Sequence, residues 1–145
     1  MSSIFIINLI ISLIATGLIW TIQLVHYPSM KFVPEERFIS FHNFHSKRIS
    51  ILAIPIMLIE LITSFVLFYQ NINSYNHIFT INLLIVILIW ISTFLIQVPL
   101  HNTLSYSKNE NILNRLIFSN WIRTILWSTR SVMLVIFLAI ILNLI

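Results

Sequence analysis

Apolar residues gather along this chain in four long runs separated by polar segments. The runs are rich in Ile and Leu and cover residues 4–25, 49–69, 78–98 and 125–144. A helix needs about 20 apolar residues to cross a hydrocarbon core about 30 Å thick, and each run reaches that length. Strands that cross a membrane form barrels of alternating polarity, and these runs do not alternate. The pattern therefore predicts an all-α, four-helix membrane bundle in a single transmembrane domain, residues 1–145.

The composition supports lipid as the surrounding solvent. The chain has 145 residues, of which 59% are hydrophobic and only 8% are charged. A soluble domain carries about 25% charged residues, so this chain has too few charges to cover a water-exposed surface. The net charge of +4 comes from scattered basic residues between apolar runs, which does not favour nucleic-acid binding. Cysteine is absent, so disulfides and thiolate metal sites are excluded.

The polar connections predict how the helices are oriented. Residues 70–77 form a short connection without formal charge, whereas two longer connections hold nearly all the Lys and Arg residues. Both long connections lie on the same side, because one pair of helices separates them. The positive-inside rule makes that side cytoplasmic and places both termini outside. We therefore expect a multi-pass protein of the cell membrane, with membrane lipids among its partners.

The long connections carry helical periodicity of their own. Residues 34–36, Pro-Glu-Glu, are typical of a first helical turn, where acids lie near the positive end of the helix dipole. One helical face is then formed by Phe38, Phe41, His42 and His45. Residues 113–120 form a similar face ahead of the fourth run. Helices two and four are therefore expected to extend beyond the membrane into the cytoplasm.

A weak internal repeat relates the two halves of the chain. Gln23 precedes a histidine near the end of the first helix, and Gln97 does so in the third. Residues 45–48 and 120–123 then follow these glutamines at nearly the same distance. Two similar helical hairpins would be related by an axis along the membrane normal. Chance similarity between apolar sequences is the alternative.

Four histidines are expected together at the cytoplasmic face. These candidate metal ligands are His26, His42, His45 and His101. Imidazole binds Zn, Cu and Fe, and two histidines from facing helices can ligate haem. His26 and His101 are expected at similar depth, as an axial pair requires. The alternative is that these amphipathic rings only sit at the depth of the lipid headgroups, so a metal ion or haem depends on whether they converge.

Glu60 and Arg130 are the charged residues deepest within the predicted spans, and they are the candidate catalytic residues. A charged side chain in a span costs about 2.5–3.5 kcal/mol on insertion scales, so it generally faces protein or a water-filled cavity. The two residues are expected at depths that a long arginine side chain can bridge. A structural ion pair is therefore the alternative to a catalytic or proton-relay role.

Four more residues are candidates for binding a cofactor: Arg123, Trp127, Gln23 and Gln97. Arg123 and Trp127 lie on one stripe of the fourth helix, where an arginine can hold a carboxylate, a phosphate or a haem propionate. Gln23 and Gln97 each lie about one turn from a histidine and could orient its ring. Plain hydrogen bonds between helices are the alternative role for these amides.

The sequence leaves three classes of function open. The leading hypothesis is a membrane-embedded enzyme or redox protein whose site opens toward the cytoplasm. It would be an oxidoreductase using metal or haem, acting on a lipid-soluble or anionic small molecule. The second is a small oligomeric transporter or channel, such as a homodimer. The third is a membrane scaffold or interaction subunit in which the polar residues only pack helices.

Overall fold

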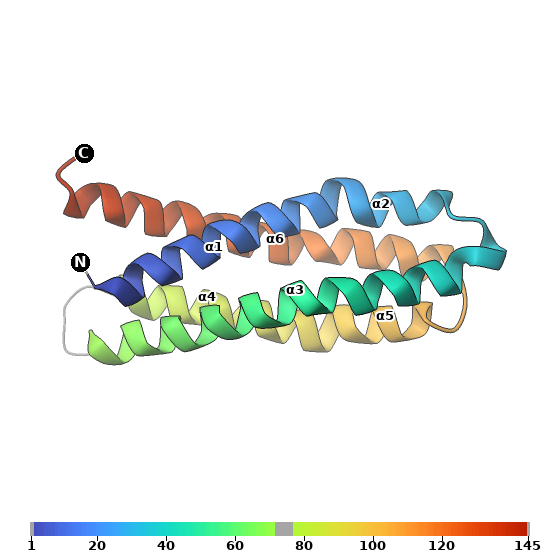
Figure 1. Ribbon diagram of the computed structural model, residues 1–145, viewed down its shortest axis with the longest axis horizontal. Coiled ribbons are helices and arrows are strands. Elements are labelled where there is room, and N and C mark those ends of the chain that lie inside the picture. Colours follow the sequence, from blue (N-terminus) through green and yellow to red (C-terminus); the bar gives the residue numbers. More distant parts are fainter. Residues whose placement is uncertain (1, 72–76, 145) are drawn as a thin grey trace.

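The computed structural model describes residues 2–71 and 77–144, and the regular structure within these ranges is entirely helical. It forms four long rods, each made of one helix or several consecutive helices (Figure 1). In chain order the rods are Ser3–Phe32, Glu35–Gln70, Ile78–Leu104 and Glu110–Ile141. The four apolar runs therefore correspond to four helical rods, as the sequence predicts.

Each rod is long enough and apolar enough to cross a membrane. The rods contain 30, 36, 27 and 32 residues. At about 1.5 Å of rise per residue, they are about 40–54 Å long, whereas a hydrocarbon core is about 30 Å thick. Every rod is thus longer than one hydrocarbon core.

The second and fourth rods are each a single helix, α3 (Glu35–Gln70) and α6 (Glu110–Ile141). α3 continues through Pro55 without interruption. The N-cap of α6 is Asn109, whose side chain accepts a hydrogen bond from the Ile112 N–H at 3.1 Å. The expectation that both helices begin well before their apolar runs is confirmed.

The first and third rods also extend beyond the apolar runs from which they were predicted. The first contains α1 (Ser3–Thr21), η1 (Ile22–His26), α2 (Tyr27–Ser29) and η2 (Met30–Phe32). The third contains α4 (Ile78–Ser92), η3 (Thr93–Gln97) and α5 (Val98–Leu104). The predicted spans at residues 4–25 and 78–98 therefore lie within longer helical rods.

Both extensions pass a proline by way of a π-helical segment. η1 and η3 are π-helices, and each is followed by a proline in the first turn of the next helix, Pro28 or Pro99. Proline has no N–H and its ring clashes with the carbonyl four residues earlier. The wider π turn shifts the bonding by one residue: the Tyr27 N–H donates to the Ile22 carbonyl, and the Val98 N–H to the Thr93 carbonyl.

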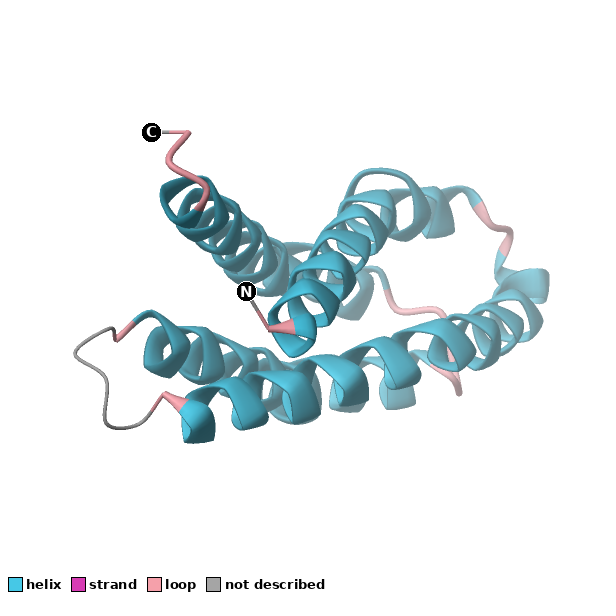
Figure 2. Cartoon of the chain, turned by 60° about the vertical axis from the view of Figure 1, so that its left-hand side comes forward, coloured by secondary structure: helices cyan, strands magenta, loops and turns pink. Residues whose placement is uncertain are grey.

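The rods pack side by side along the long axis of the molecule (Figures 1 and 2). The first and third rods each contact both the second and the fourth. N and C lie at one end of the molecule, and the connections at residues 33–34 and 105–109 lie at the opposite end (Figure 1). We call that opposite end the connection end.

The bundle carries apolar side chains on its outside and buries many polar side chains among the apolar ones of its interior. Each rod exposes large apolar side chains, for example Ile10, Phe65, Leu84 and Ile125. The buried polar or charged residues include Asn8, Ser12, Gln23, Glu60, Ser64, Asn82, Gln97, Asn120, Thr124, Arg130 and Ser131. Contiguous apolar surface on this scale is unusual for a monomer in water and is typical of contact with lipid.

Candidate functional site

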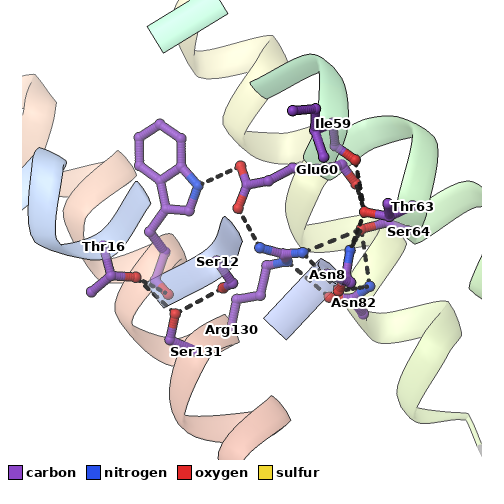
Figure 3. A network of polar contacts seen from close by, with 11 residues as sticks. Asn8, Ser12, Thr16, Ile59, Glu60, Thr63, Ser64, Asn82, Arg130 and Ser131 are labelled. Atoms are coloured by element: carbon purple, nitrogen blue, oxygen red, sulfur yellow. Dashed lines mark hydrogen bonds and ion pairs between the residues drawn. The ribbon is translucent and has the colours of Figure 1, made fainter. Parts of the chain in front are cut away.

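The deepest polar residues meet in one network that joins all four rods (Figure 3). The Arg130 guanidinium pairs with the carboxylate of Glu60. Its Nε donates to Asn82 Oδ1 at 2.8 Å, and Nη2 donates to Asn8 Oδ1 at 3.0 Å. Trp127 Nε1 donates to the second carboxylate oxygen of Glu60 at 2.9 Å. We call this group, together with Ser64, the central network.

Burial explains why the central network is so fully bonded. The side chains of Arg130 and Glu60 are 0% and 1% exposed, and buried charges are tolerated only when they are paired and hydrogen-bonded. Ser64 Oγ completes the network by accepting hydrogen bonds from Asn8 and Asn82, both at 3.0 Å. The predicted structural ion pair is therefore present. A catalytic role for Glu60 and Arg130 stays a prediction, because their contacts already account for both residues as an interhelical clamp.

A chain of hydroxyl groups beside the central network joins the first and fourth rods. Ser131 Oγ lies 2.8 Å from Ser12 Oγ and 2.8 Å from Thr16 Oγ1 (Figure 3). Thr16 Oγ1 also donates to the Trp127 carbonyl at 3.2 Å. These bonds hold the backbone of α6 against α1 at the position where Trp127 reaches Glu60.

Gln23 and Asn120 form a smaller network nearer the connection end. Asn120 Nδ2 donates to Gln23 Oε1 at 2.8 Å, and Gln23 Nε2 donates to the Ile117 carbonyl at 3.2 Å. Arg123 lies beside them: its Nη1 is 3.4 Å from Asn120 Oδ1, and its guanidinium is 5.0 Å from the centre of the Trp127 ring. Gln23 therefore uses its amide to hold the fourth rod and not to orient a histidine.

The four predicted histidines converge at the connection end. The rings of His26 and His45 stack with their centroids 3.6 Å apart. His42 Nε2 lies 3.0 Å from His101 Nδ1, and His101 Nε2 lies 2.9 Å from the Tyr27 hydroxyl. These last two hydrogen bonds make a continuous series of groups, which we call the His42–His101–Tyr27 row. Groups bonded in this way can pass a proton along the series.

The arrangement of the histidines does not support the predicted metal or haem site. Within residues 2–71 and 77–144, no group of three or more His, Cys, Asp or Glu side chains is placed to hold a metal ion. His42 and His101 direct nitrogens at each other, and His26 and His45 lie face to face, with 22° between their planes. Ligation requires several lone pairs directed at one point. A metal or haem held by these histidines stays a prediction without geometric support.

A cavity of about 430 Å³ lies beside the His42–His101–Tyr27 row, between the second and third rods. Residues between 46 and 57 form one wall, residues between 90 and 102 form the other, and Tyr27 and Arg123 also line it. Ile54 and Phe94 belong to the lining and are more than half exposed. The cavity therefore opens onto the apolar outer surface, while Tyr27, His101 and Arg123 give it a polar inner wall.

Buried polar atoms without a hydrogen-bond partner are concentrated around this cavity. Eight such side-chain atoms occur in the described part of the chain. Four of the eight belong to lining residues: Ser46 Oγ, Trp90 Nε1, Gln97 Oε1 and Arg123 Nε. A buried polar group without a partner costs about 1–3 kcal/mol. These atoms are thus available to a molecule that enters the cavity, unlike the bonded groups of the central network.

Three residues of this site were missed by sequence reasoning: Tyr27, Ser46 and Trp90. Tyr27 was overlooked because it follows the first apolar run, which ends at residue 25, and the histidines beside it drew the attention. The internal repeat was an available signal, because Tyr27 and His101 have the same spacing along the chain as Gln23 and Gln97, 74 residues. Asn8 and Asn82 have this spacing too, and both Tyr27–His101 and Asn8–Asn82 are in contact. Of the predicted cofactor-binding residues, Arg123 and Gln97 line the cavity, whereas Gln23 and Trp127 are bonded elsewhere.

Comparison with known proteins adds no functional information. No protein-family model, curated protein or solved structure matches this chain. The function therefore has to be argued from its own side chains.

Proposed function

We propose that this chain is a multi-pass membrane enzyme that acts on a lipid-soluble molecule bound in the cavity beside Tyr27 and His101. The observation that carries the proposal is the His42–His101–Tyr27 row, because its last two members line that cavity. A hydrogen-bonded series that ends at a cavity is what proton transfer to a bound molecule requires.

The distribution of polar and apolar side chains supports a location within the membrane. The exposed faces of all four rods carry Ile, Leu and Phe, while Arg130 and Glu60 are buried between the rods. In lipid this distribution is favourable, because apolar side chains meet acyl chains and charges meet each other. Seven of the eight Lys and Arg residues lie at the connection end or in the halves of α3 and α6 next to it, and the eighth is the buried Arg130. The positive-inside rule makes that end cytoplasmic.

The position of the cavity supports a substrate that arrives from the lipid. Its volume of about 430 Å³ lies within the range of about 300–1,000 Å³ that is usual for small-molecule sites. Because Ile54 and Phe94 are exposed on the outer surface, a molecule dissolved in the bilayer can enter between the second and third rods. Its polar head would then lie against Tyr27, His101 and Arg123.

The row suggests how these residues take part in the reaction. The Tyr27 hydroxyl exchanges a proton with the head group, and His101 passes that proton to or from His42. The Nδ1 of His42 is a buried atom without a hydrogen-bond partner and is the far end of the row. Positioned acids and bases typically accelerate a reaction by about 10²–10⁴-fold. Tyr27 is thus the proposed catalytic residue, and His101 and His42 are proposed as its proton relay.

The experiment that tests this function works with an unidentified substrate. The purified protein in lipid nanodiscs is incubated with a total membrane lipid extract, and the mixture is compared with a protein-free sample by mass spectrometry. We expect at least one lipid-soluble species to be consumed and a product to appear. Tyr27→Phe should slow that conversion by about 10²–10⁴-fold, and His101→Gln should slow it as well.

A matched control is provided by Tyr106→Phe, since Tyr106 is 82% exposed and lies outside the row. This variant should convert the substrate at the wild-type rate. The absence of any converted species, or conversion that proceeds equally well in Tyr27→Phe, would overturn the proposal. The same preparation should be assayed for metals and for a haem spectrum, because a stoichiometric metal lost in His42→Ala would replace the relay by a metal centre.

A further inference from the structure

Two arginines of α6 are buried, but they differ in their partners. Arg130 pairs with Glu60. Arg123 is 7% exposed, and the ion pairs found among the described residues are Arg130–Glu60 and Lys108–Glu110. No carboxylate in the described ranges therefore balances the charge of Arg123.

The neighbours of Arg123 are weak substitutes for a counter-ion. Asn120 Oδ1 accepts from Nη1 at 3.4 Å, which is long for a hydrogen bond to a guanidinium. The Trp127 ring supplies a cation–π contact at 5.0 Å, and the Tyr27 hydroxyl also lies close by. The Nε atom has no partner at all. A buried charge without its opposite is strongly unfavourable, so this guanidinium is poised to bind an anion.

The cavity wall shows which chemical groups such an anion should carry. Arg123 Nε and Trp90 Nε1 are donors without acceptors, and both residues line the cavity. Gln97 Oε1 and Ser46 Oγ are also without partners and can receive a hydrogen bond from a hydroxyl. The head group therefore needs oxygen atoms that accept from Arg123 and Trp90. The lateral opening at Ile54 and Phe94 requires the rest of the molecule to be apolar.

We propose that the cavity binds an anionic amphiphile, with a carboxylate or phosphate-monoester head held by Arg123 and an apolar chain that leaves between the second and third rods. This inference relies on the proposed function only for the use of the cavity as the substrate site. The charge preference rests on the unbalanced Arg123. Carboxylate and phosphate share this chemistry, and they come from different lipids.

The test compares amphiphiles that have equal chains and different heads. Palmitate, 1-palmitoyl lysophosphatidic acid and the neutral 1-monopalmitoylglycerol are added to the purified protein in detergent, and binding is followed by native mass spectrometry and by the thermal unfolding temperature. We expect at least one anion to bind about tenfold to a hundredfold more tightly than the neutral lipid, as charge-assisted hydrogen bonds allow. The preferred anion identifies the head as carboxylate or phosphate.

Variants of Arg123 assign the preference to this residue. Arg123→Gln should reduce the discrimination between anionic and neutral lipids to less than about threefold, and Arg123→Lys should retain part of it because the charge remains. The control is Arg115→Gln on the same helix, where Arg115 is exposed. It should discriminate as the wild type does. If Arg123→Gln fails to fold, Trp90→Phe serves instead, because it removes one donor and should weaken anion binding several-fold.

The outcomes separate this inference from the proposed function. Equal binding of anionic and neutral amphiphiles by the wild type, or a preference that survives in Arg123→Gln, would overturn the inference. Conversion of a neutral lipid that depends on Tyr27 would then leave the enzyme proposal standing. Tight binding of an anion that depends on Arg123, without any Tyr27-dependent conversion, would support the inference and remove the enzyme proposal.

Discussion

Arg130 donates to the Glu60 carboxylate across 70 residues of sequence, and the pair lies where neither side chain reaches the surface. The same carboxylate accepts from Trp127, and the same guanidinium reaches Asn8 and Asn82. The pair is therefore the point at which all four rods are tied together, and its removal should affect the stability of the whole bundle.

Breaking the pair from either side should destabilise the protein strongly. Glu60→Leu or Arg130→Met alone leaves one buried charge without its partner, which typically costs about 3–5 kcal/mol. The double variant removes both charges and should recover a large part of that loss. Thermal unfolding in detergent measures the three variants against wild type. A loss in the double variant equal to the sum of the two single losses would show that the charges do not interact.

The double variant also separates the two roles considered for Glu60 and Arg130. If the pair is only an interhelical clamp, the double variant should regain lipid-converting activity together with stability. If either side chain is catalytic, stability should return while activity stays lost. The measurement is the lipid-conversion assay on protein that is confirmed to be folded.

Removal of the Tyr27 hydroxyl should affect activity much more than stability. Tyr27→Phe keeps the buried ring and removes the bond of the hydroxyl to His101 and its contact with Arg123, so the free energy of unfolding should fall by less than about 3 kcal/mol. The rate of conversion should fall by about 10²–10⁴-fold, because the proton donor at the cavity is lost. Loss of stability in proportion to the loss of activity would instead assign Tyr27 a structural role.

Asn8 and Asn82 should contribute similarly to stability. Each donates to Ser64 and accepts from Arg130, so either Asn→Leu change leaves buried donors and acceptors unpaired. We expect a loss of about 1–3 kcal/mol for each single variant. Asn114→Leu, at an exposed position of α6, is the control and should be nearly neutral. A large difference between Asn8→Leu and Asn82→Leu would argue against equivalent positions in the two hairpins.

Metal analysis decides whether the histidine cluster is a metal centre. Because His42 and His101 bond to each other and His26 stacks on His45, we expect substoichiometric metal and no haem absorption band in purified protein. Stoichiometric Zn, Cu or Fe that is lost in His42→Ala and His101→Ala would contradict this expectation. His77→Ala is the matched control, since His77 is exposed and lies outside the cluster.

The number, type and approximate place of the helices could be predicted because each is a continuous apolar run long enough to cross a bilayer. The convergence of the four histidines was also predictable, because all of them lie near the same end of their helices. The ends of the first and third rods, at Phe32 and Leu104, could not be predicted from the apolar runs. Proline generally interrupts a helix, whereas a π segment before Pro28 and before Pro99 lets each helix continue.

The partners of individual side chains could be predicted only where charge limits the choice. Glu60 is the single acid within a predicted span, so its pairing with Arg130 followed from composition and depth. The cavity could not be inferred in this way. Its lining depends on how α3 is rotated toward the third rod, and a helix that is apolar all round gives no periodic signal for that rotation.

The two π segments have a consequence for how this molecule can change. Each extra residue in a helix turns everything after it by about 100°. η1 and η3 separate the stretches that carry Asn8 and Asn82 from the ends that carry Tyr27 and His101. A π turn, however, takes up one extra residue within the turn itself, so deletion of one residue from either segment would restore an α-helical turn and leave the end that carries the row in its present phase relative to the central network. The extra residue thus lets each helix pass its proline while Tyr27 and His101 keep their positions, and a single-codon deletion would bring the proline ring against the carbonyl four residues earlier.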